Sequence, residues 1–255
     1  VLYYLFRTRI RTIRLTAASL HPSGALLRAI CSLGVSPFLN QMAMFLVQIT
    51  LNNTLTYYGA LSHYGEDIPL ACVGVISKVN ILMLGFTLGI SQGCQPIFSY
   101  NYGARQYSRV REAYRKAIVA ASIICCIAFV CFQLFPRPIV ALFDPSGSEE
   151  YFQFAERYFR IYMFMTLANA FQPITANFFT SIGKAKRGAL IALTRQVIFL
   201  IPLILIFPLF LGIDGVMYAG PIADSAAVVV ALALVTREMK RMPHVDEPVA
   251  ADTLV

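Results

Sequence analysis

Amide side chains recur at helical spacing inside apolar stretches of the chain. On the first such stretch, the residues that share one helical face are Gln41, Phe45, Gln48 and Asn52. Polar groups are costly inside a bilayer, so they tend to face a cavity or a partner helix. We expect this face to line a polar and aromatic cavity that binds a small molecule. The alternative is that the amides hold helix to helix through hydrogen bonds.

Two later stretches carry similar polar stripes. The first comprises Asn80, Thr87 and Ser91, with Gln95 nearby, and the second comprises Asn169, Gln172 and Thr180. Methionines close to these stripes, such as Met44, Met163 and Met165, would offer adaptable apolar contacts to varied ligands. The same two interpretations, a cavity lining or contacts between helices, stay open for both stripes.

Asp224 is the acid that lies deepest within an apolar run, and Arg195 lies about two turns inside the preceding run. An acid at this depth either binds a coupling ion, H⁺ or Na⁺, or pairs with the arginine. The sequence leaves both possibilities open. The six cysteines and three histidines lack the spacing of metal ligands, so we expect no metal site and no cofactor.

Sets of catalytic residues are missing from the apolar runs. A prenyl-transferring enzyme would need paired Asp-rich motifs for Mg²⁺-diphosphate, and an intramembrane protease a Ser/His or Asp/Asp set. We therefore predict that the protein is not an enzyme. An intramembrane lipid-modifying enzyme is kept as the alternative from another class, together with a purely structural scaffold.

The composition is that of a membrane protein. Of the 255 residues, 58% are hydrophobic and 13% charged, against about 25% charged in soluble domains, and the mean hydropathy is +0.65. The net charge of +8 does not indicate nucleic-acid binding, because the charges lie between long apolar runs.

Six apolar runs have the length of about 20 residues that a membrane-spanning helix needs. They cover residues 36–59, 70–100, 113–135, 154–181, 189–211 and 213–236. The sequence therefore predicts an all-α membrane protein with a six-helix lobe over residues 36–236. The link at residues 211–215 is so short that the last two helices should be antiparallel neighbours.

Most of the 21 lysines and arginines fall in alternate loops, which predicts that these loops and both ends of the chain are cytoplasmic in the cell membrane. Residues 1–35 resemble the end of a preceding helix and a basic linker, and residues 237–255 a disordered tail. We expect the chain to be a fragment that is preceded by a second six-helix bundle.

The segment "SQGCQPIFSYNYGARQYSRV", residues 91–110, places polar groups at the predicted cytoplasmic exit of the second run. Pro96 should bend the helix, and Gly103 should end it in the left-handed conformation. The basic residues from Arg105 to Lys116 should then start an amphipathic segment along the lipid headgroups. This exit is either a gate or an ordinary helix end.

Three blocks of residues in order resemble the multidrug and toxic compound extrusion (MATE) family, and most of all its bacterial branch with DinF- and MepA-like members. The first block holds Gly93, Gln95, Pro96, Asn101, Tyr102, Gly103 and Ala104. The second holds Gly183, Lys184, Ala185, Arg195, Gln196 and Pro202, and the third Gly212, Gly215, Ala219, Pro221 and Asp224.

The resemblance implies a transporter of two six-helix lobes around a central cavity, of which this chain would be the second. It implies an antiporter that exports amphipathic organic cations by alternating access, driven by H⁺ or Na⁺. Some branches carry acids in the spans that match 36–59 and 154–181, whereas this chain has Gln48 and Asn52 in the first. The coupling carboxylate is therefore expected in the other lobe. The alternative within transport is a flippase for lipid-linked precursors.

Overall fold

The computed structural model describes residues 23–145, 147–243 and 246, and within them it contains helices and turns but no strand. The chain divides into two units, residues 1–38 and 39–255. The prediction of an all-α protein is confirmed. The predicted helix end and first part of the linker, residues 1–22, and most of the predicted tail lie outside the described residues. The domain boundaries therefore stay predictions.

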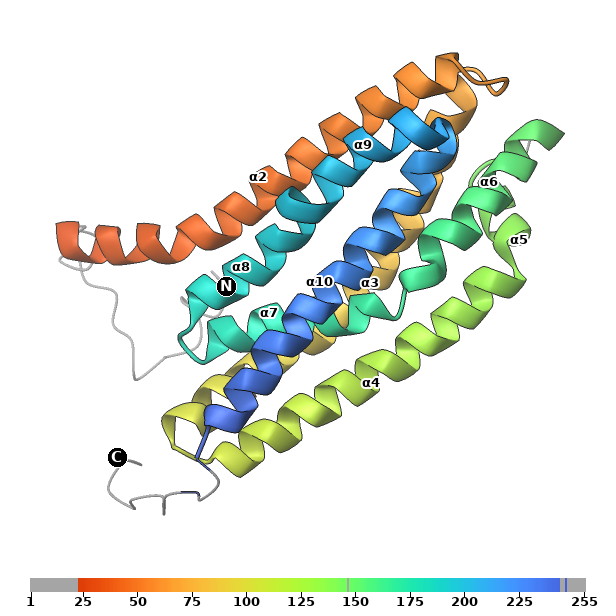
Figure 1. The fold of residues 1–255 in the computed structure, drawn as a ribbon. Helices are drawn as coiled ribbons and strands as arrows, with labels where there is room; N and C mark the ends of the chain where they lie inside the picture. Colours follow the sequence, from red (N-terminus) through yellow and green to blue (C-terminus); the bar gives the residue numbers. More distant parts are fainter. Residues whose placement is uncertain (1–22, 146, 244–245, 247–255) are drawn as a thin grey trace, which may run out of the picture. The chain divides into compact units, whose positions relative to one another are not determined.

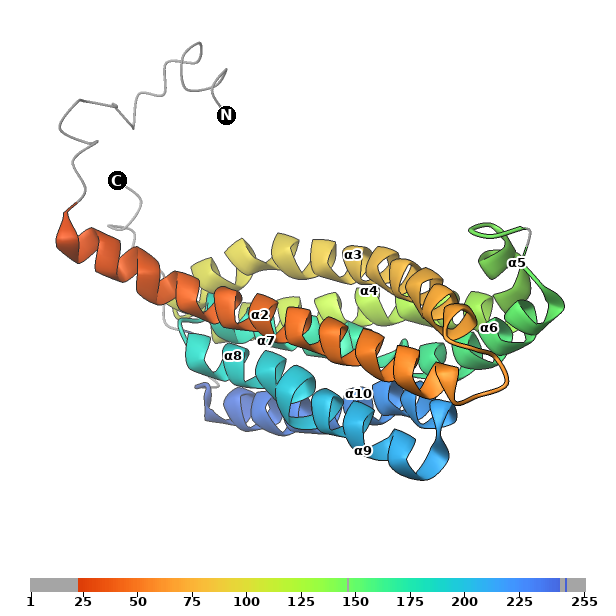
Figure 2. The same cartoon turned by 90° about the horizontal axis from the view of Figure 1, so that it is seen from above.

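The helices follow one another along the chain as Figures 1 and 2 label them. They are α2 (Gly24–Ala60), α3 (Asp67–Gly103), α4 (Tyr107–Leu134), α5 (Pro136–Ala141), α6 (Glu149–Tyr162), α7 (Ala168–Ser181), α8 (Ala185–Leu193), α9 (Ile201–Leu211) and α10 (Ile213–Arg241). A 3₁₀ turn, Met163–Met165, follows α6, and a π-helix, Thr194–Leu200, joins α8 to α9.

Four helices in the described part are long and apolar enough to cross a membrane: α3, α4, the continuous segment Ala185–Leu211, and α10. They correspond to four of the six predicted spans. The first predicted span, residues 36–59, lies inside α2, which begins earlier, at Gly24, and whose described residues are not among these four. The last helix, α10, continues to Arg241, beyond the predicted end of the lobe at Thr236.

The fourth predicted span, residues 154–181, is wrong as a single helix. It is broken between α6 and α7, where Thr166 Oγ1 donates to the carbonyl of Met163 at 2.6 Å. Pro173 lies inside the first turns of α7. A proline has no N–H for the carbonyl four residues earlier, so the Asn169 carbonyl in the first turn of α7 lacks its helical donor.

The helix α7 is the centre of the second unit, because it packs against α3, α4, α8 and α10. Its Phe178 is fully buried. The Phe178 ring makes an edge contact with the Phe98 ring of α3, at a centroid distance of 5.4 Å. It makes a tilted contact with the Tyr114 ring of α4, at 5.1 Å. Aromatic contacts of this kind add to the burial of apolar area. The break before α7 therefore lies next to the best-packed part of the unit.

The helices α9 and α10 are joined through Gly212 alone, which has φ of +60°. Left-handed backbone of this kind is readily adopted by glycine. The two helices pack against each other (Figure 1). The prediction that they are close neighbours with a very short link is confirmed.

The end of α3 differs from the prediction in its backbone conformation. Gly103 is the last helical residue, and the left-handed conformation falls on Arg105, with φ of +56°. The turn closes when the Gln106 N–H donates to the Asn101 carbonyl at 2.9 Å, so the positive φ comes two residues later than predicted. From Tyr107 onward the chain belongs to the continuous helix α4, which contains most of the amphipathic segment predicted to start at Arg105. Its position along the lipid headgroups stays a prediction.

At the opposite end of these helices, α6 has a polar start. The Ser148 hydroxyl accepts a hydrogen bond from the Tyr151 N–H at 3.2 Å and caps the helix. Arg137 donates to Glu149 at 2.6 and 3.2 Å, and this hydrogen bond lowers the pKa of Glu149. These charges hold the loop between α5 and α6 at the solvent-exposed end of the unit.

Candidate functional site

The predicted polar face of α2 is exposed. Val47, Leu51 and Leu55 are buried in the core of the second unit, whereas Gln41, Gln48 and Asn52 are exposed and the ring of Phe45 is 61% exposed. The Gln48 amide donates to the Asn52 side-chain carbonyl at 2.9 Å, along the same face. The amides of α2 are therefore not used to pack the second unit, and they lie on its exposed surface.

The stripe on α3 has another outcome. Ser91 is buried, and its hydroxyl donates to the Pro173 carbonyl at 3.3 Å and accepts from the Asn177 amide at 2.6 Å. Thr87 is buried beside Cys125 of α4, at 3.9 Å. These side chains connect α3 with α7 and α4, as the alternative of contacts between helices predicted.

The remaining predicted cavity residues are distributed differently. The Gln172 amide is half-buried and donates to the Ile191 carbonyl of α8 at 3.5 Å, the long limit of a hydrogen bond. Asn80 is also half-buried, in α3. The side chain of Asn169 lies outside the described residues. The structure thus brings together the residues of α2 and does not place Gln172 on the same exposed face.

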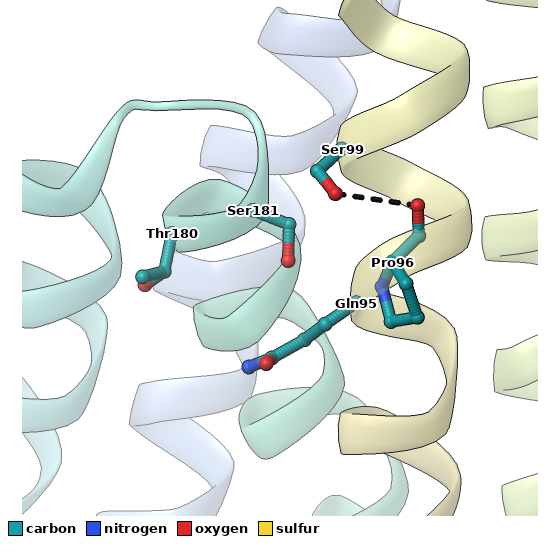
Figure 3. Close-up of a pocket in the computed structure, with 5 residues that line it drawn as sticks. All are labelled: Gln95, Pro96, Ser99, Thr180 and Ser181. Carbon is teal, nitrogen blue, oxygen red and sulfur yellow. Dashed lines mark hydrogen bonds between the residues drawn. The ribbon is translucent and has the colours of Figure 1, made fainter. Parts of the chain in front are cut away.

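A pocket of about 410 Å³ lies between the later turns of α3 and the end of α7. Its lining consists of Gln95, Pro96, Ser99, Thr180 and Ser181. Figure 3 shows the Gln95 side chain extending from α3 toward the α7 residues. In the described part of the chain the Gln95 amide makes no hydrogen bond, so its donors and acceptor face the pocket.

Pro96 leaves a backbone acceptor without its helical donor one turn before the pocket. Because a proline has no N–H, the carbonyl of Gln92 lacks its usual helical donor. The Ser99 hydroxyl donates to the Pro96 carbonyl at 3.2 Å, within the same helix (Figure 3). Two residues of the first MATE-like block, Gln95 and Pro96, therefore form one wall of a site that suits water or a small polar group.

Arg195 and Asp224 form a buried ion pair. Arg195 Nε lies 2.5 Å from Asp224 Oδ1, and the two side chains are 13% and 12% exposed. Arg195 and the buried Gln196 lie in the π-helix, which comes just before Pro202. The proline cannot donate to the chain four residues earlier, and π segments of this kind often accompany such an interruption. Of the two roles left open for Asp224, the geometry matches the ion pair.

The surroundings of this pair are closely packed. A Cβ atom at Gly220, one turn before Asp224, would lie 2.6 Å from the ring of Tyr162. Pro221 lies inside the continuous helix α10 and is buried. Only a residue without a side chain lets the end of α6 approach α10 this closely. Asp224 is thus held in a site that is filled by protein on several sides.

A second charge cluster was missed in the sequence. The buried carboxylate of Glu238 in α10 forms salt bridges with Lys184 and Arg187, which lie at the start of α8. Lys184 also lies over the ring of Tyr102, at 6.0 Å from its centroid. The turn before Lys184 depends on Gly183, which has φ of +78°.

This cluster unites residues from two separate MATE-like blocks, since Tyr102 belongs to the first and Lys184 to the second. The signal that predicts it is the spacing of Ala231, Val235, Glu238 and Met242, all buried on one face of α10 and its end. The prediction of a disordered tail from residue 237 excludes Glu238 from the helix, whereas α10 continues to Arg241.

Comparisons with known proteins agree on one family. The MatE family model matches residues 40–206, more than half of the chain. The multidrug export protein MepA of Staphylococcus aureus (strain bovine RF122 / ET3-1) is 22% identical over 237 residues, 92% of this chain and 49% of MepA. MepA of Staphylococcus haemolyticus (strain JCSC1435) is 22% identical over 232 residues, 90% of this chain. The chain spans about half the length of these relatives.

Solved structures show the same fold. A multidrug resistance MATE family transporter of the MOP superfamily in an outward-facing conformation is similar with a TM-score of 0.81 and 21% identity, over 94% of this chain and 52% of that one. An inward-facing conformation of such a transporter gives a TM-score of 0.78. With three motif blocks, the predicted helices and the family model in agreement, the chain belongs to the MatE family of multidrug and toxic compound extrusion transporters.

Proposed function

We propose that this chain forms one lobe of a secondary antiporter that exports amphipathic organic cations by alternating access. The other lobe would be a second six-helix bundle of the same protein, and the substrate would bind between the two. Export would be coupled to the entry of H⁺ or Na⁺. The membrane would be the cell membrane, with both ends of the chain in the cytoplasm, as the distribution of lysine and arginine predicts.

The observation that carries this proposal is the exposed face of α2. Gln41, Gln48 and Asn52 stand on an apolar helix, yet they are not buried in the second unit. In a bilayer such amides are unfavourable unless they meet water or polar partners. A wet chamber opposite α2 supplies both, and Phe45 on the same face provides an aromatic surface for an organic cation.

The interrupted helices support a mechanism with moving parts. The break between α6 and α7 precedes Pro173, and the π-helix precedes Pro202. Pro96 and Pro221 lie within continuous helices, where each removes one backbone hydrogen bond. We propose that these four positions are where helices bend between inward-open and outward-open states. A coupling ion shifts this equilibrium only by its different affinity for the two states.

We propose that the coupling carboxylate lies outside this chain. Asp224 is already neutralised by Arg195, so it would bind a coupling ion only in a state in which the arginine has moved away. The same pairing argues against the alternative of a flippase for lipid-linked precursors. Such a cavity needs arginines free to bind a diphosphate, and Arg195 is engaged by Asp224.

The test is transport by the full-length protein in proteoliposomes that contain ethidium. We expect an imposed proton or sodium gradient to drive dye export, and the double substitution Gln48→Leu/Asn52→Leu to reduce the rate strongly. Asn53→Leu is the matched control, because Asn53 is also an exposed amide in α2 but lies one residue round the helix from Asn52.

A gradient-independent dye distribution would overturn the antiport proposal. Equal losses in the Asn53 variant and in the double variant would overturn the assignment of the face that carries Gln48 and Asn52. Wild-type export with unchanged rates in all variants would place the substrate elsewhere in the protein.

A further inference from the structure

A second cavity of the unit has a chemistry unlike that of the Gln95 pocket. A groove of about 410 Å³ runs between α4 and α10, with Phe171 of α7 between them. Its walls are almost wholly apolar, with Ile118 on α4 and Leu232 and Met239 on α10. The helix α7 packs against both α4 and α10, and so joins the two walls (Figure 1).

The two cations that line this groove stand toward one end of it. Arg115 lies one turn before Ile118 in α4, and Lys240 lies two turns after Leu232 in α10. Both are exposed, and neither forms an ion pair with another residue that the structure describes. The nearby Glu112 carboxylate is paired with Lys116 instead, at 2.7 Å. The groove is therefore apolar along its length and positive at one end.

We propose that this groove binds an anionic phospholipid, with one acyl chain along the apolar walls and the phosphate between Arg115 and Lys240. Both α4 and α10 are apolar enough to span the membrane, so the groove walls lie at the depth of acyl chains. From Leu232 to Lys240 the helix rises about 12 Å, at about 1.5 Å per residue. That length fits part of an acyl chain below a headgroup, and basic pockets between helices bind such headgroups.

An amphiphile fits this arrangement better than a free anion or another protein helix. A free phosphate would use Arg115 and Lys240 but make no contact with the apolar walls. A protein helix would cover the walls but would have to bring its own acid to meet the two cations. A lipid with one negative charge matches both features at once. Its acyl chain lies along the apolar walls while its phosphate reaches the two cations at the end of the groove.

The experiment is native mass spectrometry of the purified full-length protein with dioleoylphosphatidylglycerol, compared with dioleoylphosphatidylcholine. We expect the wild type to retain one phosphatidylglycerol molecule in preference to phosphatidylcholine. Arg115→Ala/Lys240→Ala should weaken this binding about 25-fold, since each cation near an anionic lipid contributes roughly a factor of 5. Arg109→Ala/Arg237→Ala is the control, because it removes the same charge from exposed residues of α4 and α10 outside the groove.

A second variant tests the apolar part. Ile118→Trp fills the groove and leaves both cations in place, so we expect it to abolish phosphatidylglycerol retention while the thermal unfolding midpoint stays near that of the wild type. Glycerol 3-phosphate at millimolar concentration should not displace the lipid.

Three results would overturn the proposal. One is the same affinity for both lipids, and another is an equal loss in the two double variants. The third is displacement by glycerol 3-phosphate, which would show a site for the phosphate group alone.

Discussion

Two regions of the molecule place polar side chains in apolar helices, the face of α2 from Gln41 to Asn52 and the pair of Arg195 with Asp224. On α2 the amides are exposed and bond only along their own helix, as in the contact of Gln48 with Asn52. Arg195 and Asp224 are buried and bond across helices. A polar group at membrane depth can thus be stabilised by a partner within the unit or left for something outside it.

This difference separates structural from functional polar residues. A group that already has a buried partner contributes to the fold, and its removal leaves the partner without compensation. A group with no such partner contributes little to folding, so its presence in an apolar helix needs another explanation. The comparison predicts opposite patterns of stability and transport when the two regions are altered.

The largest expected effect is that of Asp224→Asn in the full-length protein. It leaves a buried arginine unpaired, which destabilises proteins by about 3–5 kcal/mol. Reversible unfolding in mixed micelles measures the loss. Asp214→Asn is the control, because Asp214 pairs with Arg157 at a more exposed site and should change stability by less than about 1 kcal/mol.

Rescue sharpens this prediction. The double variant Arg195→Met/Asp224→Leu removes both charges together, and it should recover most of the lost stability. We interpret the pair as two buried charges that mainly neutralise each other. A double variant as unstable as Asp224→Asn would contradict this interpretation.

An intermediate effect is expected for Glu238→Gln. The buried carboxylate accepts from both Lys184 and Arg187, and hydrogen bonds to charged groups contribute about 1.5–3 kcal/mol. We expect a loss of about 2 kcal/mol in unfolding free energy, less than for Asp224 because both cations are 35% exposed and can turn to water. Glu112→Gln, which removes an exposed acid beside Lys116, serves as the comparison. Equal losses in the two variants would remove the distinction between buried and exposed charges.

The smallest effect on stability is expected for Asn52→Leu. Its side chain is exposed and bonds only to Gln48, so the unfolding free energy should change by no more than about 0.5 kcal/mol. Unfolding in the same micelles measures this, with Ser91→Ala as a buried polar counterpart in α3. A loss of about 2 kcal/mol or more would show that Asn52 is structural, and the contrast between the two regions would fail.

By itself the sequence determined the helical character, most of the membrane-spanning segments and the family. Apolar runs of about 20 residues are strong local signals, and three blocks with fixed residues are specific. That Gln41 and Gln48 share one face of α2 also followed from spacing, because residues seven apart lie on the same side of a regular helix. Local chemistry decided these features.

Only the tertiary structure decided which polar groups have partners. Ser91 and Asn52 look alike in the sequence, yet one bonds to α7 and the other is exposed. The two basic partners of Glu238 lie more than 50 residues away in the chain. The ring of Phe178 in α7 packs on rings of α3 and α4 that are also distant in sequence. Such contacts join segments that are distant in sequence, and a hydrogen bond or an ion pair across that distance exists only once the chain has folded.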